Sequence, residues 1–257
     1  MLTKTLKYIV AILVGVLIIG AMSVAVLMGR QNRKPLVCKG LEVVVLDSLE
    51  NDFVSSKDVK LFLEKEYGSY LGKQLDSVDL YKVEKIVDGR SAVLKSEAFV
   101  TKDGILHIEV TQRKPVVRFQ KADGGFYADQ HGFIFPLQSS YASYVQIIDG
   151  EIPINTKSGY KGEIEDPAQK EWFNKVMKLV NFIEGSNWKD KIVQIHVGNG
   201  GELTVIPREG KEKFILGQPV NIEDKFSRIE KYYGAIAANG KQYSTVNLKY
   251  DGQIVCR

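Results

Sequence analysis

The three histidines are the first residues to test for chemistry, because histidine is the commonest general base near neutral pH. His107 and His196 each occupy the polar phase of a predicted strand, and His131 lies in a predicted turn. Nucleophilic catalysis needs a nucleophile, a base within hydrogen-bond reach and an orienting acid. The sequence contains no Gly-x-Ser-x-Gly elbow or comparable signature. We therefore predict that the chain is not an enzyme.

Two other patterns that can bind ligands are better explained as turns. The stretch Gly198-Asn199-Gly200-Gly201 leads into a predicted strand, whereas a phosphate-binding loop needs a helix N-terminus behind it. Asp149 and Glu151 are flanked by Gly150 and Pro153, which favours a solvated loop over a catalytic carboxylate pair. The sequence therefore predicts no cofactor and no small-molecule substrate.

The two cysteines, Cys38 and Cys256, lie near opposite ends of the folded part of the chain. Neither has metal-ligand spacing with another cysteine or a histidine, so no metal site is predicted. A disulfide between them requires a close approach that the sequence does not establish. Two free thiols are the default expectation, with a single disulfide as the alternative.

The excess of positive charge lies before the folded part. The five basic residues that precede Leu36 have no acidic neighbours, and they are Lys4, Lys7, Arg30, Arg33 and Lys34. Without them, 30 Lys and Arg remain against 31 Asp and Glu, so the rest of the chain has a net charge of about −1. A nucleic-acid-binding protein normally gathers positive charge on its folded part. We predict no nucleic-acid partner.

Residues 8–28, YIVAILVGVLIIGAMSVAVLM, form a run without a charged side chain. As a helix this run reaches about 30 Å, the thickness of the hydrocarbon core of a bilayer. A cleaved signal peptide would have a shorter apolar core, with its cleavage site after the run, and a soluble helix would have a polar face. We predict an uncleaved transmembrane helix. Its basic flanks nearly balance, so they do not decide its orientation.

Residues 36–115 are predicted to form a strand, two helices and two strands. Ser55 to Asp58 has the spacing of a capping box, and Asp88-Gly89 ends the second helix. Asp103-Gly104 is a strong hairpin-turn signal between the last two strands. The predicted elements are strand 40–46, helices from 55 and from about 78, and strands 92–100 and 105–112.

The remainder predicts a mostly antiparallel sheet that carries two helices. Asp166-Pro167 and Asn221 are expected to begin those helices, and Asn239-Gly240 is expected to end the second. The predicted strands are 192–197, 203–206, 213–216, one through Val246 and a final segment at 254–256. The whole fold is therefore predicted to be α+β.

The order of these elements resembles known proteins. A β-α-α-β-β module ending in HIEVTQRKP, with Val110, Arg113 and Pro115 as V-x-x-R-x-P, resembles a POTRA domain. FYADQHGFIFP at 126–136 and VNLKY at 246–250 are similar to the first hairpin and the last strand of the second domain in the FtsQ/DivIB family. A single POTRA domain behind a membrane anchor also resembles this bacterial cell-division family.

The resemblance implies a domain organisation and a role. The expected parts are a cytoplasmic tail (1–7), a transmembrane helix (8–28), a POTRA domain (36–115) and a β-domain (116–257). The body would be periplasmic, anchored in the inner membrane and enriched at the division septum. It would act as a non-catalytic scaffold that binds the division proteins FtsB and FtsL, with other division proteins meeting the POTRA domain.

The C-terminal strand is the candidate binding site. A last strand can leave an unpaired sheet edge, which either is protected or accepts a strand from a partner. The residues alone leave these two alternatives equal, whereas the resemblance favours partner binding. Tyr250 and Gly252 match the binding segment of the family best. The other candidates follow by continuity and are Asp251, Gln253, Ile254 and Val255.

Two alternative functions remain at this point. A POTRA-type factor for assembling outer-membrane proteins would usually contain several POTRA repeats or a barrel, and neither is visible in the sequence. A membrane-anchored periplasmic enzyme would need a cluster of titratable residues, and the sequence shows none.

Overall fold

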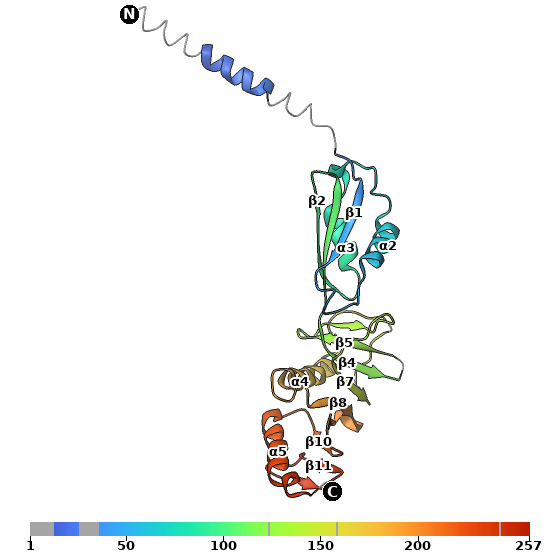
Figure 1. Cartoon of the computed structure of the whole chain (residues 1–257), viewed down its shortest axis with the longest axis vertical. Coiled ribbons are helices and arrows are strands. Elements are labelled where there is room, and N and C mark those ends of the chain that lie inside the picture. The colour runs from blue at the N-terminus through green and yellow to red at the C-terminus, as the bar shows by residue number, and fades with distance from the viewer. Residues whose placement is uncertain (1–12, 26–35, 123, 158, 242) are drawn as a thin grey trace, which may run out of the picture.

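The computed structural model describes residues 13–25, 36–122, 124–157, 159–241 and 243–257. The elements follow the long axis of the molecule, with a small sheet between the helix of residues 13–25 and a large sheet that extends to the C-terminus (Figure 1). Residues 13–25 are helical, and the rest of the predicted anchor, 8–12 and 26–28, lies outside the described residues. No helix within the described ranges is both long and apolar enough to cross a membrane. The anchor therefore stays a prediction.

The small sheet has the predicted β-α-α-β-β order. Its strands are arranged β1-β3-β2, with β1 parallel and β2 antiparallel to β3. The elements are β1 (Gly40–Val45), α2 (Ser56–Tyr67), the short 3₁₀-helix η1 (Leu75–Ser77), α3 (Leu80–Asp88), β2 (Val93–Val100) and β3 (Ile105–Gln112). The hairpin predicted at Asp103-Gly104 is confirmed, with Gly104 at a φ of 95°.

Side-chain caps explain where both helices of this part begin. Ser55 Oγ accepts a hydrogen bond from the amide of Asp58 at 3.1 Å and donates one to the Asp58 carboxylate at 2.7 Å. Asp79 accepts from the amide of Lys82 at 3.0 Å. Such caps satisfy amides that have no partner within the helix. The buried residues of the two helices are Val59, Leu63, Val83 and Val87.

The large sheet has nine strands in the order β12-β11-β10-β9-β8-β7-β4-β5-β6. Five of its eight strand pairs are antiparallel and three are parallel, which confirms the predicted mostly antiparallel α+β fold. Its strands are β4 (Pro115–Lys121), β5 (Gly124–Asp129), β6 (Ile134–Pro136), β7 (Gln146–Gly150), β8 (Ile192–Val197), β9 (Leu203–Pro207), β10 (Lys213–Gly217), β11 (Thr245–Asn247) and β12 (Val255–Cys256).

Two helices, α4 (Pro167–Glu184) and α5 (Ile222–Ala235), lie on the same side of the large sheet (Figure 1). Asp166 caps α4 by accepting from the amide of Gln169 at 2.9 Å, and Pro167 follows at the first helical position as predicted. Both helices and the sheet share one apolar core. The core side chains of α4 are Phe173, Val176, Met177, Leu179, Val180 and Ile183.

Three sequence predictions are wrong in detail. Strands β4 and β7 were not predicted, and Asp149 lies in β7 rather than in a loop. Helix α5 ends at Ala235, while Asn239-Gly240 closes the separate 3₁₀-helix η3 (Ala237–Asn239). The strand expected at 246–250 ends at Asn247, because the Asn247 side chain accepts from the amide of Lys249 at 2.9 Å and turns the chain.

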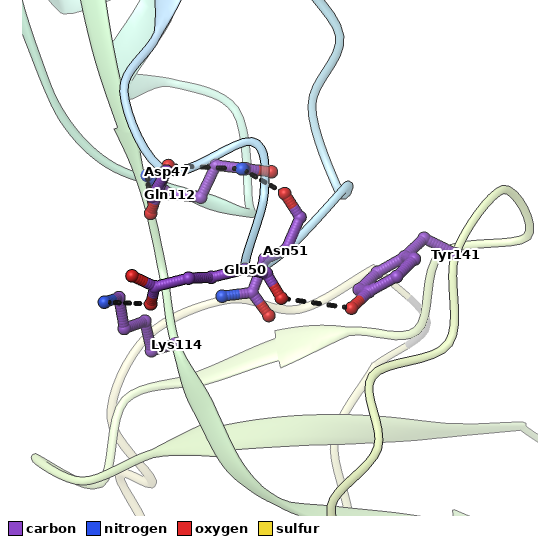
Figure 2. Close-up of polar contacts among 6 residues, drawn as sticks. All are labelled: Asp47, Glu50, Asn51, Gln112, Lys114 and Tyr141. Atoms are coloured by element: carbon purple, nitrogen blue, oxygen red, sulfur yellow. Dashed lines mark hydrogen bonds and ion pairs between the residues drawn. The ribbon is translucent and has the colours of Figure 1, made fainter.

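Gln112, at the end of β3, connects the loop after β1 to the point where the chain enters the large sheet. Its fully buried amide accepts from the amide of Val54 at 2.8 Å and donates to the carbonyl of Asn51 at 2.7 Å. Figure 2 shows this amide beside Asp47, with Glu50 paired to Lys114. Buried amides are costly unless they are paired, so this network holds the loop in one conformation.

Aromatic contacts continue this connection into the large sheet. Phe53, in the loop after β1, packs edge-on against Tyr127 of β5, Phe135 of β6 and Tyr141. The ring centroids are 5.3, 5.8 and 4.8 Å away respectively. A single apolar core therefore contains residues from both sheets. Arg113 and Asp129 form an ion pair in the same region. We use the name joint for three features together: these aromatic contacts, the Gln112 network and the Arg113–Asp129 ion pair.

Candidate functional site

The large sheet has two edges that differ in protection. At β6, Ile134 and Gly162 exchange backbone hydrogen bonds of 2.8 and 2.9 Å, which covers part of that edge. At the other edge, no strand within the described ranges pairs with the outer side of β12. This edge lies at the end of the molecule farthest from the small sheet (Figure 1). It is the place where an additional strand would join.

The backbone of the edge has a defined register. Thr245 and Arg257 exchange two hydrogen bonds of 3.0 Å, and Val246 lies opposite Cys256. Because hydrogen-bonded and non-hydrogen-bonded pairs alternate in an antiparallel ladder, the backbone amide and carbonyl of Cys256 point away from β11. These groups are available to an added strand.

The predicted binding residues divide between a turn and this strand. Tyr250, Asp251 and Gly252 lie in the turn that joins β11 to β12, where Tyr250 is 57% exposed. Gly252 has a φ of 69°, a conformation that favours glycine. Val255 lies in β12 and is 37% exposed, while Gln253 and Ile254 connect the turn to the strand. The six candidates, which are consecutive in the sequence, thus extend from the turn into the first residue of β12.

The side chains around the segment have mixed polarity. Lys249 forms an ion pair with Glu202 before the turn. Cys256 and Ile254 pack against the core beneath the sheet. Burial raises the pKa of the Cys256 thiol, so this thiol is protonated at neutral pH. Both cysteines are free, and Cys38 is buried in the other part of the chain. The edge therefore presents backbone groups and the side chains of Tyr250 and Val255, with the exposed charges of Lys249, Asp251 and Arg257 around them.

Sequence reasoning missed Arg228, which lies on α5 and is 3% exposed. Its Nη1 donates to the carbonyls of Tyr250 and Gln253, each at 2.7 Å. Its Nη2 lies 2.8 Å from the carboxylate of Asp224, close enough for an ion pair. The sequence of α5 did contain a hint of this buried arginine. Lys225 and Arg228 are three residues apart and so share one side of the helix. Both are buried.

The histidines lie in three separate places. His196 Nδ1 is 2.8 Å from the Asp149 carboxylate, which also accepts from Gln194 at 2.6 Å. His107 stacks on Phe99 with ring centroids 5.2 Å apart, and His131 contacts Gln130. In the described part of the chain, no group of three or more His, Cys, Asp or Glu residues could hold a metal ion. The C-terminal edge thus remains the best candidate site.

Comparison with known families places both parts of the chain. Residues 36–111 match a family described as POTRA-like domain. Residues 114–257 match a family described as FtsQ/DivIB, C-terminal related. No curated protein matches the chain. The second match covers more than half of the 257 residues. The chain therefore belongs to the FtsQ/DivIB C-terminal related family and is an FtsQ/DivIB-like protein with a POTRA-like domain.

Proposed function

We propose that this protein is a non-catalytic scaffold of the bacterial division complex, which binds FtsB and FtsL by strand addition at β12. Family membership supports the division role. The observation that supports the site is the outer side of β12, which no described strand covers. Through this contact the scaffold would help to regulate synthesis of the septal cell wall.

The geometry of the edge suggests how affinity and specificity would be divided. A two-residue strand offers few backbone hydrogen bonds to a partner. Strand addition gains affinity from backbone bonds and specificity from side chains in alternate positions. Because β12 is short, exposed side chains must contribute much of the contact. Tyr250 and Val255 are the large apolar side chains exposed there.

The organisation proposed for the rest of the chain places this edge away from the membrane. Residues 8–28 would anchor the protein in the inner membrane, after a cytoplasmic tail of residues 1–7. The POTRA domain (36–115) would meet other division proteins, and the β-domain (116–257) would extend into the periplasm. The position of β12 at the far end of the large sheet fits this arrangement (Figure 1).

Replacing Tyr250 by aspartate is expected to weaken capture of FtsB–FtsL about tenfold or more, because tyrosines that become buried on binding often dominate interfaces. The fold should survive, since Tyr250 is more than half exposed. Full-length protein in detergent would be tested by quantitative pull-down and by circular dichroism. Tyr144→Asp is the matched control, because Tyr144 is 85% exposed and lies before β7. Equal capture by the wild-type and Tyr250→Asp proteins would exclude the edge as the site.

The topology has its own test. A reporter that is active only in the periplasm should give signal when fused after Arg257 of the full chain. A reporter active only in the cytoplasm should stay silent at the same position. The opposite pattern would reverse the orientation and remove the proposed periplasmic docking role.

A further inference from the structure

We propose that Arg228 is the positioning residue of the docking edge: from helix α5, it holds the turn between β11 and β12 so that β12 is presented in a fixed register. This inference rests on the proposed function for its binding consequence. Its structural part stands on contacts within the chain.

The guanidinium of Arg228 has the geometry to hold the turn. One nitrogen, Nη1, donates to the carbonyls of Tyr250 and Gln253 at 2.7 Å each. These two carbonyls lie at the two ends of the turn, so a single rigid group joins both ends. Hydrogen bonds from a charged donor are shorter and stronger than neutral ones. The planar guanidinium also fixes direction better than a flexible ammonium group.

The burial of Arg228 makes its contacts with the turn costly to break. Arg228 is 3% exposed, and a buried charge is costly unless it is paired and hydrogen-bonded. Its partners are the two turn carbonyls and the carboxylate of Asp224, which is itself 57% exposed. Opening the turn would remove two of these partners from a cation that has little access to water. The burial of Arg228 therefore favours the closed turn.

The turn before β12 has few restraints besides Arg228. Strand β12 has two residues and, among the described strands, pairs with β11 alone. Within the turn, the amide of Gln253 donates to the carbonyl of Tyr250 at 3.2 Å, which is long. The Cβ that a side chain would add at Gly252 meets no atom within 4 Å, so the turn itself is loosely packed. A short strand of this kind frays unless it is held from outside.

Helix α5 supplies a matched control. Lys225 is also 3% exposed and cationic, but its Nζ donates to the carbonyl of Gln218 at 2.8 Å, before the helix. Lys225→Met removes a buried cation and its carbonyl contact without touching Tyr250 or Gln253. Arg228→Met removes the contacts with the turn. Arg228→Lys keeps the charge but lacks the planar, fixed donor geometry of the guanidinium.

The experiment uses the full-length chain in detergent and measures two properties of each variant. Hydrogen exchange of the 250–257 segment and alkylation of Cys256, followed by mass spectrometry, report opening of the turn. Pull-down of FtsB–FtsL reports docking. In Arg228→Met we expect the rates of hydrogen exchange and of Cys256 alkylation to rise about tenfold. Capture of FtsB–FtsL should fall by a similar factor. Arg228→Lys should give intermediate values. Lys225→Met, which removes a cation that faces Asp251 but donates to no carbonyl of the turn, should change both properties much less than Arg228→Met.

The outcomes separate the two proposals. If hydrogen exchange and Cys256 alkylation in Arg228→Met proceed at the wild-type rates, the role of Arg228 is overturned, even if Tyr250→Asp abolishes capture. Faster exchange with unchanged capture would show that docking does not depend on the register of β12, which would also overturn the inference. If Arg228→Met does not fold, Arg228→Lys provides the same comparison against Lys225→Met. Equal exchange in those two variants would then count against the role of Arg228.

Discussion

Phe53→Ala will lower the free energy of unfolding by about 3–5 kcal/mol, the range for removing a buried phenylalanine. Phe53 is 3% exposed and contacts three aromatic rings. Edge-to-face ring pairs contribute beyond the burial of apolar area. The substitution leaves a cavity among rings from two sheets, and neither sheet can close it without shifting against the other.

The measurement is urea denaturation followed by two probes. Both tryptophans, Trp172 and Trp188, lie in the part that contains the large sheet, so their fluorescence reports that part. Circular dichroism reports both parts. Because the cavity is shared, the midpoints of both probes should fall. A loss confined to circular dichroism would show that the joint does not couple the two sheets.

Phe99→Ala is the matched control for this prediction. Phe99 lies on β2 and is 42% exposed, and its main ring contact is the stacked His107. Removing it should cost about 1 kcal/mol or less, because an exposed side chain leaves no cavity. An equal effect of the two substitutions would contradict the role assigned to Phe53.

The elements that the sequence predicted best are those fixed by local chemistry. The caps at Ser55 and Asp166 and the turn at Asp103-Gly104 act within a few residues of the chain. Their signals are therefore complete within a short window. The apolar faces of α3 and α4 follow the helical period and needed no tertiary information.

Of the two missed strands, β7 depended on distant partners, whereas β4 forms a hairpin with its neighbour β5. β7 has five residues, and its parallel neighbours β4 and β8 lie about 30 residues before and 45 after it in the chain. Parallel pairing of this kind needs long connections and leaves no local turn signal. The short apolar pair Ile147-Ile148 could not be distinguished from a loop by periodicity.

The sequence predicted the candidate site at the C-terminal strand, but it did not predict Arg228, the residue that contacts this segment from α5. Tyr250 and Val255 were predicted from a resemblance, and in the structure they lie in the turn and in β12 respectively. Arg228 acts on that segment across 22 and 25 residues, through backbone carbonyls that carry no side-chain signature. A buried arginine is visible in a sequence only as a break in an apolar face.

Asp129→Ala is expected to cost about 3–5 kcal/mol, because it leaves a cation unpaired in a buried site. Arg113 Nη1 donates to Asp129 Oδ2 at 2.9 Å, and the two side chains are 14% and 6% exposed. The guanidinium also lies 3.4 Å from the centroid of the Phe133 ring. The other oxygen of Asp129 accepts from the amides of His131 and Phe133 at 2.9 and 3.0 Å. The carboxylate thus serves the joint and the hairpin turn between β5 and β6 together.

Two further variants separate these contributions. Asp129→Asn keeps an acceptor for the turn amides but loses the charge, so its cost should be about half that of alanine. Arg113→Met combined with Asp129→Ala removes the stranded cation, so the double variant should be more stable than the sum of the single effects predicts. A double-mutant cycle from chemical denaturation measures this difference, expected at about 1–3 kcal/mol for contacting residues. Additive effects would mean that Arg113 is already well solvated, and the large loss in Asp129→Ala would then belong to the turn alone.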